Sequence, residues 1–166
     1  TITMLNQTLD HAMYYNRGGG PLGDPGAPIE FYNYLQSRWA DGTALTLGGS
    51  GYNPSNPTAT PTNFVFPDNP SDPQAWTMCT ANLPSADRRM LNSHGPFTFA
   101  AGDTFTMRTA FTFHPDIPHP CPDVAGLVKP TILQIQQWHD DGTLNAHLDL
   151  GGVLTLAPSQ SLLLNA

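Results

Sequence analysis

The stretch Thr104-Phe105-Thr106-Met107-Arg108-Thr109-Ala110-Phe111-Thr112-Phe113 decides the fold, because apolar and polar side chains alternate along it. Successive side chains of a strand point to opposite faces, so the alternation gathers the apolar residues on one face. That face carries Phe105, Met107, Phe111 and Phe113, and the other carries Thr104, Thr106, Arg108 and Thr112. The pattern predicts a half-buried antiparallel strand over residues 104–113 whose phenylalanines seal the core.

The neighbouring segments predict partners for this strand. Residues 96–99, followed by a turn at residues 100–103, indicate a second strand and therefore a hairpin. Residues 43–47 form a further strand candidate between glycine-containing turns. Alternation over residues 144–150 and the strand-like residues 153–156 indicate a closing hairpin, or a region of uncertain register.

Two segments have apolar residues at helical spacing, and we predict a short helix in each. Residues 29–39 follow Pro28, which suits the first position of a helix. Residues 130–141 are followed by Gly142, a typical C-cap. The pattern of residues 1–16 is compatible with either a strand or a short helix.

Glycine and proline make residues 17–28 and much of residues 52–87 loop-like. The second segment is unusually long for a compact domain, so it needs anchors. The candidate anchors are Phe64, Phe66, Trp76 and Cys79. Together these elements predict a mainly β fold, an antiparallel β-sandwich with one or two short helices and long Pro/Gly-rich loops, as a single domain over residues 1–166.

The composition excludes some classes of partner. Lys+Arg number 6 against 13 Asp+Glu, for a net charge of −7, and Lys129 is the single lysine. Nucleic-acid and anionic-membrane binders need clustered basic residues, so neither class is expected. Only 11% of the residues are charged, against about 25% in typical domains. Because Thr, Asn, Ser and Gln supply the polarity instead, the composition is typical of an extracellular protein.

The two ends of the sequence bear on how the chain is made. No apolar run approaches the ~20 residues of a membrane-spanning helix, and no signal-peptide pattern opens the chain. Because the first residue is Thr1, the chain is either processed or a piece of a longer polypeptide. We favour the piece.

Cys79 and Cys121 are the two cysteines of the chain. A bridge between them would close a loop of about 43 residues and contribute on the order of 4 kcal/mol on the chain-entropy model. In an oxidising compartment such a bridge is expected as readily as its alternative, two buried free thiols.

A dense group of candidate metal ligands lies between residues 114 and 123. It consists of His114, Asp116, His119, Cys121 and Asp123. These are the residue types that bind zinc and other transition metals. Intervening prolines force an extended path that splays neighbouring side chains apart, so the alternative is a rigid loop anchored by Cys121. That alternative is the preferred one.

A second candidate site would take calcium. Asp68 and Asp72, with Asn69 and Ser71, offer the hard oxygen ligands that Ca²⁺ prefers. The spacing is not that of an EF-hand, and such residues more often bond their own backbone in turns. No other cofactor is indicated.

Two further motifs could carry chemistry. Residues 87–89, Asp-Arg-Arg, could tie a loop to the sheet or bind an acidic ligand, and the acidic chain favours the tie.

Ser93 and His94 could join an aspartate in a catalytic triad, but no nucleophile elbow, HExxH motif or P-loop is present. Glu30 is the single glutamate, so no carboxylate pair stands out for glycosidase chemistry. Tyrosines and tryptophans could form a sugar-stacking platform, although most aromatic residues of such a domain fill the core.

An ordered set of short motifs resembles a module of large secreted proteins of Bacteroidota that are exported by the type IX (Por) secretion system. The motifs are Phe31-Tyr32-Asn33-Tyr34-Leu35, Asp41-Gly42-Thr43, Gly48-Gly49-Ser50-Gly51-Tyr52, Pro61-Thr62-Asn63-Phe64-Val65-Phe66-Pro67-Asp68, Trp76, Asp87-Arg88-Arg89-Met90, Ser93-His94-Gly95-Pro96-Phe97-Thr98, Gly102-Asp103 and Pro120-Cys121-Pro122-Asp123. They span roughly residues 30 to 140 and keep their order. The resemblance implies export to the cell surface or the medium and a much longer parent chain. It implies no reaction and assigns no catalytic residue. The C-terminal sorting domain usual in such cargo has no counterpart in this sequence, which fits a piece.

These observations predict a non-catalytic structural or adhesive module of a secreted cell-surface protein. Its expected partners are other domains of the same parent chain or components of the cell surface. One alternative is a carbohydrate-binding or hydrolytic domain. Another is a subunit of an extracellular filament or sheath, which would associate through flat apolar patches and strand edges.

Overall fold

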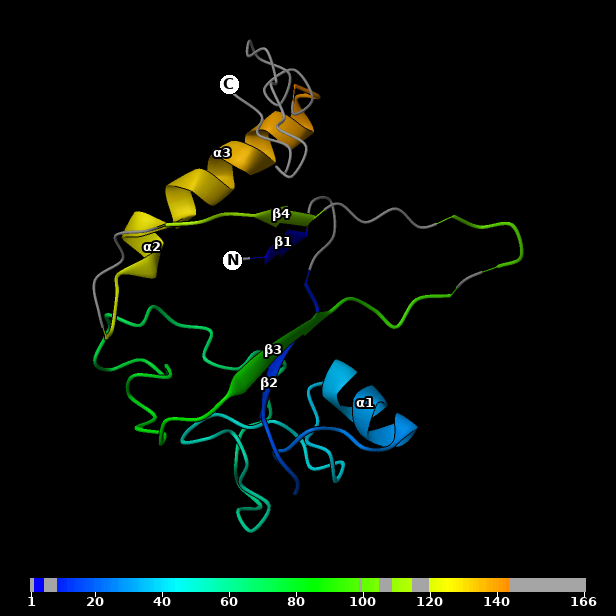
Figure 1. The fold of residues 1–166 in the computed structure, drawn as a ribbon, viewed down its shortest axis with the longest axis vertical. Coiled ribbons are helices and arrows are strands. Elements are labelled where there is room, and N and C mark those ends of the chain that lie inside the picture. Colours follow the sequence, from blue (N-terminus) through cyan, green and yellow to red (C-terminus); the bar gives the residue numbers. More distant parts are fainter. Residues whose placement is uncertain (1, 5–8, 99, 105–108, 115–119, 144–166) are drawn as a thin grey trace, which may run out of the picture. The chain divides into compact units, whose positions relative to one another are not determined.

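The computed structural model describes residues 2–4, 9–98, 100–104, 109–114 and 120–143, and this part of the chain is mostly non-helical. The elements in chain order are β1 (Ile2–Met4), β2 (His11–Asn16), α1 (Pro28–Leu35), β3 (Arg88–Ser93), β4 (Thr109–Phe111), α2 (Val124–Leu127) and α3 (Lys129–Asp140). The described strands pair as two antiparallel sheets, β1 with β4 and β2 with β3 (Figure 1). Among the described helices, none is both long and apolar enough to cross a membrane.

The chain divides into two compact units. The larger unit comprises residues 6–106 and 116–124, and it contains β2, β3 and α1. The smaller unit comprises residues 1–5, 107–115 and 125–166, and it contains β1, β4 and α3. The single domain predicted over residues 1–166 stays a prediction.

The strand pair β2–β3 runs through the larger unit. His11 lies opposite Ser93 and Asn16 opposite Arg88. Backbone hydrogen bonds continue the pairing beyond both ends of the ladder, from Asp10 N to the Ser93 carbonyl and from Arg17 N to the Asp87 carbonyl. Of the two possibilities left open for residues 1–16, the structure therefore has strands, in β1 and β2.

Helix α1 packs beside β2 and β3 (Figure 1). It begins at Pro28, and the Glu30 carboxylate accepts hydrogen bonds from the backbone N–H groups of Gly26 and Ala27 at 2.6 and 3.2 Å. These bonds satisfy donors that an uncapped helix leaves open. The helix ends at Leu35, and Ser37 then adopts a left-handed φ of 53° that turns the chain. The predicted helix is confirmed over residues 28–35, whereas residues 36–39 leave it.

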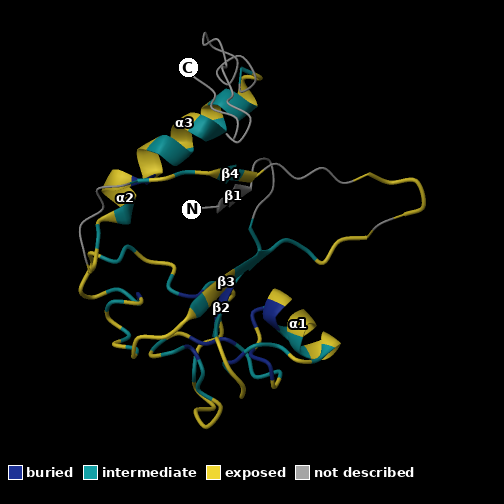
Figure 2. Cartoon of the chain, in the orientation of Figure 1, coloured by how far each residue is buried: buried dark blue, intermediate teal, exposed yellow. Residues whose placement is uncertain are grey.

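The core of the larger unit is built largely from aromatic rings. Figure 2 marks the buried residues of the chain in dark blue. Trp39 is fully buried at its centre, with ring centroids 5.4 Å from Tyr14, 6.5 Å from Tyr34 and 5.8 Å from Tyr52. These pairs meet edge to face, an arrangement worth about 0.5–1.5 kcal/mol each beyond the area that they bury. The buried members of the cluster are Met13, Tyr14, Tyr34, Trp39, Ala40, Leu45 and Val65.

Loop segments join this core through backbone hydrogen bonds rather than through a continuous sheet. Val65 N donates to the Ala12 carbonyl at 2.9 Å, Leu45 N to the Ser37 carbonyl at 2.9 Å, and Thr62 N to the Leu45 carbonyl at 3.0 Å. Residues 43–47, predicted to be a strand, form only isolated bridges at Ala44 and Thr46. That strand prediction is wrong, because each partner segment contributes a single bridge.

The predicted anchors of the long loop take part in this packing. Phe66 stacks on Tyr14 at 5.6 Å and meets Trp76 edge to face at 5.1 Å. The Trp76 indole N–H donates to the Gly49 carbonyl at 3.0 Å. Phe64 is half-buried, and its backbone forms a bridge with Ala12. The loop of residues 52–87 is therefore held by aromatic contacts, as its sequence predicted.

The phenylalanine ribbon that dominates the sequence does not form this core. Phe111 is 79% exposed and Phe113 is 87% exposed, so the prediction that they seal a core is wrong for the described part of the ribbon. The partners Phe105 and Met107 lie outside the described residues. Alternation along a strand shows which side chains share a face, but it does not show that this face is buried. The buried apolar surface of the larger unit comes instead from the cluster around Trp39.

The predicted hairpin is also corrected. Residues 96–98 form no strand, and β4 pairs with β1, in register Ile2 to Phe111. The predicted strands over residues 144–150 and 153–156 lie outside the described residues. The predicted helix over residues 130–141 is confirmed as α3.

Candidate functional site

A hollow of about 120 Å³ lies beside the end of α1 in the larger unit. Two parts of the chain line it: the last turn of α1 with the residue after it, and the end of β3 with the turn after that strand. The lining residues are Tyr32, Leu35, Gln36, Ser93, His94, Gly95 and Pro96. Tyr32 and Leu35 are spaced i, i+3 on α1 and therefore lie on one face of the helix.

A hydrogen bond fastens the two walls of the hollow together. The Ser93 hydroxyl donates to the Leu35 carbonyl at 2.5 Å, which ties the end of β3 to the last turn of α1. Leu35 is one of the last residues of the helix, whose carbonyls have no partner within the helix. Because a hydroxyl has one proton, Ser93 does not donate to an imidazole base in this geometry. The triad that the sequence allowed is thus not assembled around Ser93.

Asp10 fixes the turn that forms the far wall. Its Oδ2 lies 2.7 Å from His94 Nδ1 and accepts a hydrogen bond from Gly95 N at 2.7 Å. The hydrogen bond from Gly95 lowers the pKa of Asp10 below its usual value of 3.8, and the nearby His94 and His11 lower the pKa further. The His94 ring also stacks on Phe97, with centroids 5.8 Å apart. Sequence reasoning missed Asp10, because no local signal links it to residues 94 and 95.

Two polar side chains that line the hollow have hydrogen-bonding groups without a partner among the described residues. Among the described residues, the Tyr32 hydroxyl and the Gln36 side-chain amide have no hydrogen-bond partner. Tyr32 is 52% exposed. Of the tyrosines that could have formed a sugar-stacking platform, Tyr14 and Tyr34 are buried in the core, the preferred interpretation of the aromatic residues. The arrangement is an apolar hollow with two unpaired polar groups beside it.

The candidate metal ligands of residues 114–123 are not brought together where they are described. Cys121 is bonded to Cys79, and the Asp123 carboxylate accepts a hydrogen bond from the Asn69 amide at 2.7 Å. His114 belongs to the smaller unit, whereas Cys121 and Asp123 belong to the larger one. Asp116 and His119 lie outside the described residues, and no group of three possible ligands occurs among the described ones.

The proposed calcium ligands Asp68, Asn69 and Asp72 accept hydrogen bonds from backbone N–H groups. Asp68 Oδ2 accepts a hydrogen bond from Trp76 N at 3.2 Å, and Asp72 Oδ1 accepts one from Gln74 N at 2.9 Å. Asn69 Oδ1 accepts a bond from Val124 N at 3.0 Å. The Asp72 bond is the local turn contact that was the alternative interpretation of the segment, whereas the Asp68 and Asn69 bonds join residues 8 and 55 positions apart. A bound calcium ion stays a prediction.

The cysteines form a disulfide, the first of the two predicted alternatives. Cys79 and Cys121 are bonded, with Cα atoms 6.0 Å apart and a sequence separation of 42. The bridge joins the long loop to residues 120–123, where the Asn69 bonds to Asp123 and Val124 provide a second connection. The disulfide closes a part of the larger unit that has few regular elements.

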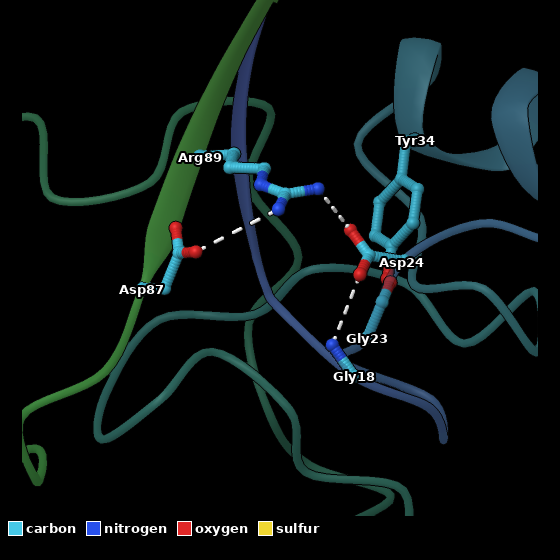
Figure 3. Close-up of polar contacts among 6 residues, drawn as sticks. All are labelled: Gly18, Gly23, Asp24, Tyr34, Asp87 and Arg89. Carbon is cyan, nitrogen blue, oxygen red and sulfur yellow. Dashed lines mark hydrogen bonds and ion pairs between the residues drawn. The ribbon is translucent and has the colours of Figure 1, made fainter.

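The Asp-Arg-Arg motif ties β3 to the loop of residues 17–28, the structural role that the sequence favoured (Figure 3). One Arg89 amino group lies 2.5 Å from Asp24, and the other lies 3.6 Å from Asp87. Asp24 in turn accepts a hydrogen bond from Gly18 N at 3.0 Å. Arg88 donates to the Pro84 carbonyl. Because Arg89 faces two carboxylates of its own chain, binding of an acidic ligand there is not supported.

Position 23, in the loop of residues 17–28, has no room for a side chain. A Cβ at Gly23 would lie 2.3 Å from the Gly18 carbonyl oxygen and 2.6 Å from that of Gly19. We expect Gly23→Ala to lower the free energy of unfolding by about 1–3 kcal/mol, because backbone atoms must move. Gly19→Ala is the matched control, since a Cβ there meets nothing within 4 Å and its φ is not left-handed. It should change stability by less than about 0.5 kcal/mol in urea denaturation, and equal costs for the two variants would contradict the loop geometry.

Ionisation of the buried Tyr34 hydroxyl is expected to lower the stability of the fold at high pH. Tyr34 is fully buried, and its single hydroxyl proton is shared between the carbonyl oxygens of Gly23 at 2.7 Å and Pro21 at 3.1 Å. Burial, together with the negative charges of Glu30 and Asp41, raises its pKa to about 12. Because the folded pKa lies above the unfolded value of 10.0, this contribution is complete below pH 10 and disappears as the pH rises through about 12.

Ultraviolet absorbance titration of the tyrosines measures this shift. We expect one tyrosine to ionise near pH 12 and to vanish from the titration of Tyr34→Phe. Unfolding measured across the same pH range should show a smaller decline in that variant. Ionisation of all tyrosines near pH 10 would show that Tyr34 is not buried.

Comparison with known proteins finds no match: no family model, no curated protein and no solved structure matches the chain.

Proposed function

We propose that this chain is a non-catalytic adhesive module of a secreted cell-surface protein, of the kind exported by the type IX secretion system. The observation that carries the proposal is the disulfide between Cys79 and Cys121. Disulfides form and persist in oxidising compartments outside the cytosol. The low charged fraction of 11% supports the same location.

The arrangement of the larger unit supports a passive rather than a catalytic role. Its loops are held by backbone hydrogen bonds and by an aromatic cluster, which makes a stiff surface. The Ser93 proton is held by a backbone carbonyl, and the Asp10 carboxylate holds the turn at Gly95. These side chains stabilise the walls of the hollow, and they position it for binding. Other domains of the parent chain or components of the cell surface are the proposed partners.

Surface labelling tests the location directly. Antibodies raised against the purified module should label intact cells of the source bacterium, and the label should disappear from cells that lack the type IX translocon. Labelling that requires permeabilised cells would overturn the proposal. An antibody against a cytosolic protein is the control for cell integrity.

The proposal includes the β-sandwich predicted from the sequence. Such a fold consists of two antiparallel sheets packed face to face about 10 Å apart. A crystal structure of the purified chain tests this part of the proposal. Two packed antiparallel sheets would support it, and a structure without them would contradict it.

A further inference from the structure

We propose that the hollow beside α1 binds one neutral pyranose ring, such as the end of a surface glycan. The inference rests on the proposed function, because it names the ligand through which the module would adhere. Three properties of the hollow support it: its size, the unpaired polar groups at its rim, and the charges around it.

The size of the hollow matches a single six-membered ring. Its volume is about 120 Å³. A cavity of about 150 Å³ accommodates benzene, so a hollow that is partly open to solvent suits one ring and is too small for a nucleotide. Tyr32, Leu35 and Pro96 provide apolar surface for the C–H face of a sugar.

The polar groups favour a sugar over an apolar side chain. The Tyr32 hydroxyl and the Gln36 amide have no partner among the described residues, and the Ser93 oxygen keeps lone pairs after it donates to Leu35. A phenylalanine or proline ring bound here would cover these groups without bonding them, which is unfavourable. Sugar hydroxyls donate and accept hydrogen bonds, so a pyranose can satisfy all three.

The charges favour a neutral ligand. The lining contains no lysine or arginine, and its one histidine, His94, lies 2.7 Å from the Asp10 carboxylate, which is positioned to neutralise it. The chain as a whole carries a net charge of −7. A uronate or another acidic sugar would therefore find no lysine or arginine to pair with its carboxylate, and the negative charge of the chain would repel it.

Titration of the ¹⁵N-labelled chain with methyl pyranosides tests the inference by NMR. We expect neutral methyl glucoside, galactoside or mannoside to shift the Gln36 side-chain amide and the backbone amides of Ser93 and Gly95. A single ring should bind weakly, with a Kd of about 1 mM. Methyl glucuronide should bind at least about tenfold more weakly because of its charge. Equal binding of the glucuronide would overturn the preference for a neutral ring.

Two variants and a matched control connect binding to the hollow. Tyr32→Ala and Gln36→Ala should each weaken binding by about tenfold, the loss of roughly one good contact. Phe31→Ala is the control: it lies on the same helix and is 51% exposed, like Tyr32 at 52%, but it does not line the hollow. It should bind normally. Equal losses in the control would place the sugar elsewhere and overturn the inference.

Two other outcomes also overturn it. If no pyranoside shifts these amides at up to about 50 mM, the hollow does not bind sugars. If N-acetyltyrosine amide shifts them at lower concentrations than any sugar, the site takes a peptide side chain instead. Surface labelling is independent of both results. If the module is exposed on cells but binds no pyranose, the proposed function stands and this inference fails. If the module binds a pyranose but is absent from the cell surface, the proposed location fails and the sugar site stands.

Discussion

Replacing Trp39 with alanine is expected to lower the free energy of unfolding by about 3–5 kcal/mol, the usual cost of deleting a large aromatic side chain from a core. Trp39 is fully buried and contacts the rings of Tyr14, Tyr34 and Tyr52. Its indole N–H also donates to the Gly51 carbonyl at 2.9 Å. Because domains of this size are stable by only about 5–15 kcal/mol, the variant should lose a large part of its stability.

Two further substitutions make this expectation specific. Trp39→Phe keeps a ring and loses the hydrogen bond, so it should cost less than the alanine variant. Phe111→Ala removes a ring that is 79% exposed and should change stability by less than about 0.5 kcal/mol. Urea denaturation of the three variants measures the order. A large cost at Phe111 with a small one at Trp39 would place the core on the phenylalanine ribbon, as the sequence alone predicted.

Removing the disulfide is expected to have an effect of similar size. The bridge between Cys79 and Cys121 spans a sequence separation of 42, for which the chain-entropy model gives about 4 kcal/mol. The double variant Cys79→Ser/Cys121→Ser should therefore unfold at a much lower urea concentration than the oxidised protein. Adding a reductant should lower the stability of the natural sequence to that of the variant.

The reductant also supplies the internal control. It should leave the serine variant unchanged, because that variant has no thiols. If reduction does not alter the unfolding of the natural sequence, the two cysteines are not bonded to each other. Peptide mapping without reduction would then show which state they occupy.

Local signals were sufficient for most of α1 and for α3, whereas the short helix α2, Val124–Leu127, was not predicted. Pro28 marks the beginning of α1, as predicted, whereas the C-cap of α3 is Asp141 and the predicted C-cap Gly142 follows it. The sequence also favoured a tie between residues 87–89 and a loop, but it did not identify the partner Asp24, which lies 65 positions from Arg89. Helix ends depend on residues close in sequence, so local patterns predict them, whereas the choice of one carboxylate among many depends on the fold.

The core was not predictable in the same way. Alternation places Phe111 and Phe113 on a common face, but it does not show whether another element covers that face. The side chains of Val65 and Leu45 are buried. Backbone hydrogen bonds to Ala12 and Ser37, which belong to other segments, hold the two residues in place. No period of 2 or 3.6 marks such residues, because each lies in a loop that is shaped by its contacts.

The candidate site was only partly predictable, for a related reason. Ser93 and His94 are neighbours that could take part in catalysis, and Tyr32 is one of several tyrosines, but nothing in the local sequence connects Tyr32 with the other two. The hydrogen bond from Gly95 to Asp10 joins residues 85 positions apart, and the bond from Ser93 to Leu35 joins residues 58 apart. The hollow exists because these long-range bonds bring the end of α1 and the end of β3 together.

Native-state amide hydrogen exchange tests the central claim, that the loops of the larger unit are as firmly folded as its strands. The loop amides of Leu45, Thr62 and Val65 are bonded to backbone carbonyls, as are those of the β2–β3 ladder. We predict opening free energies for these amides within about 1 kcal/mol of those in β2 and β3. Loop amides that exchange at nearly the rate of an unfolded chain, while the ladder stays protected, would contradict the account.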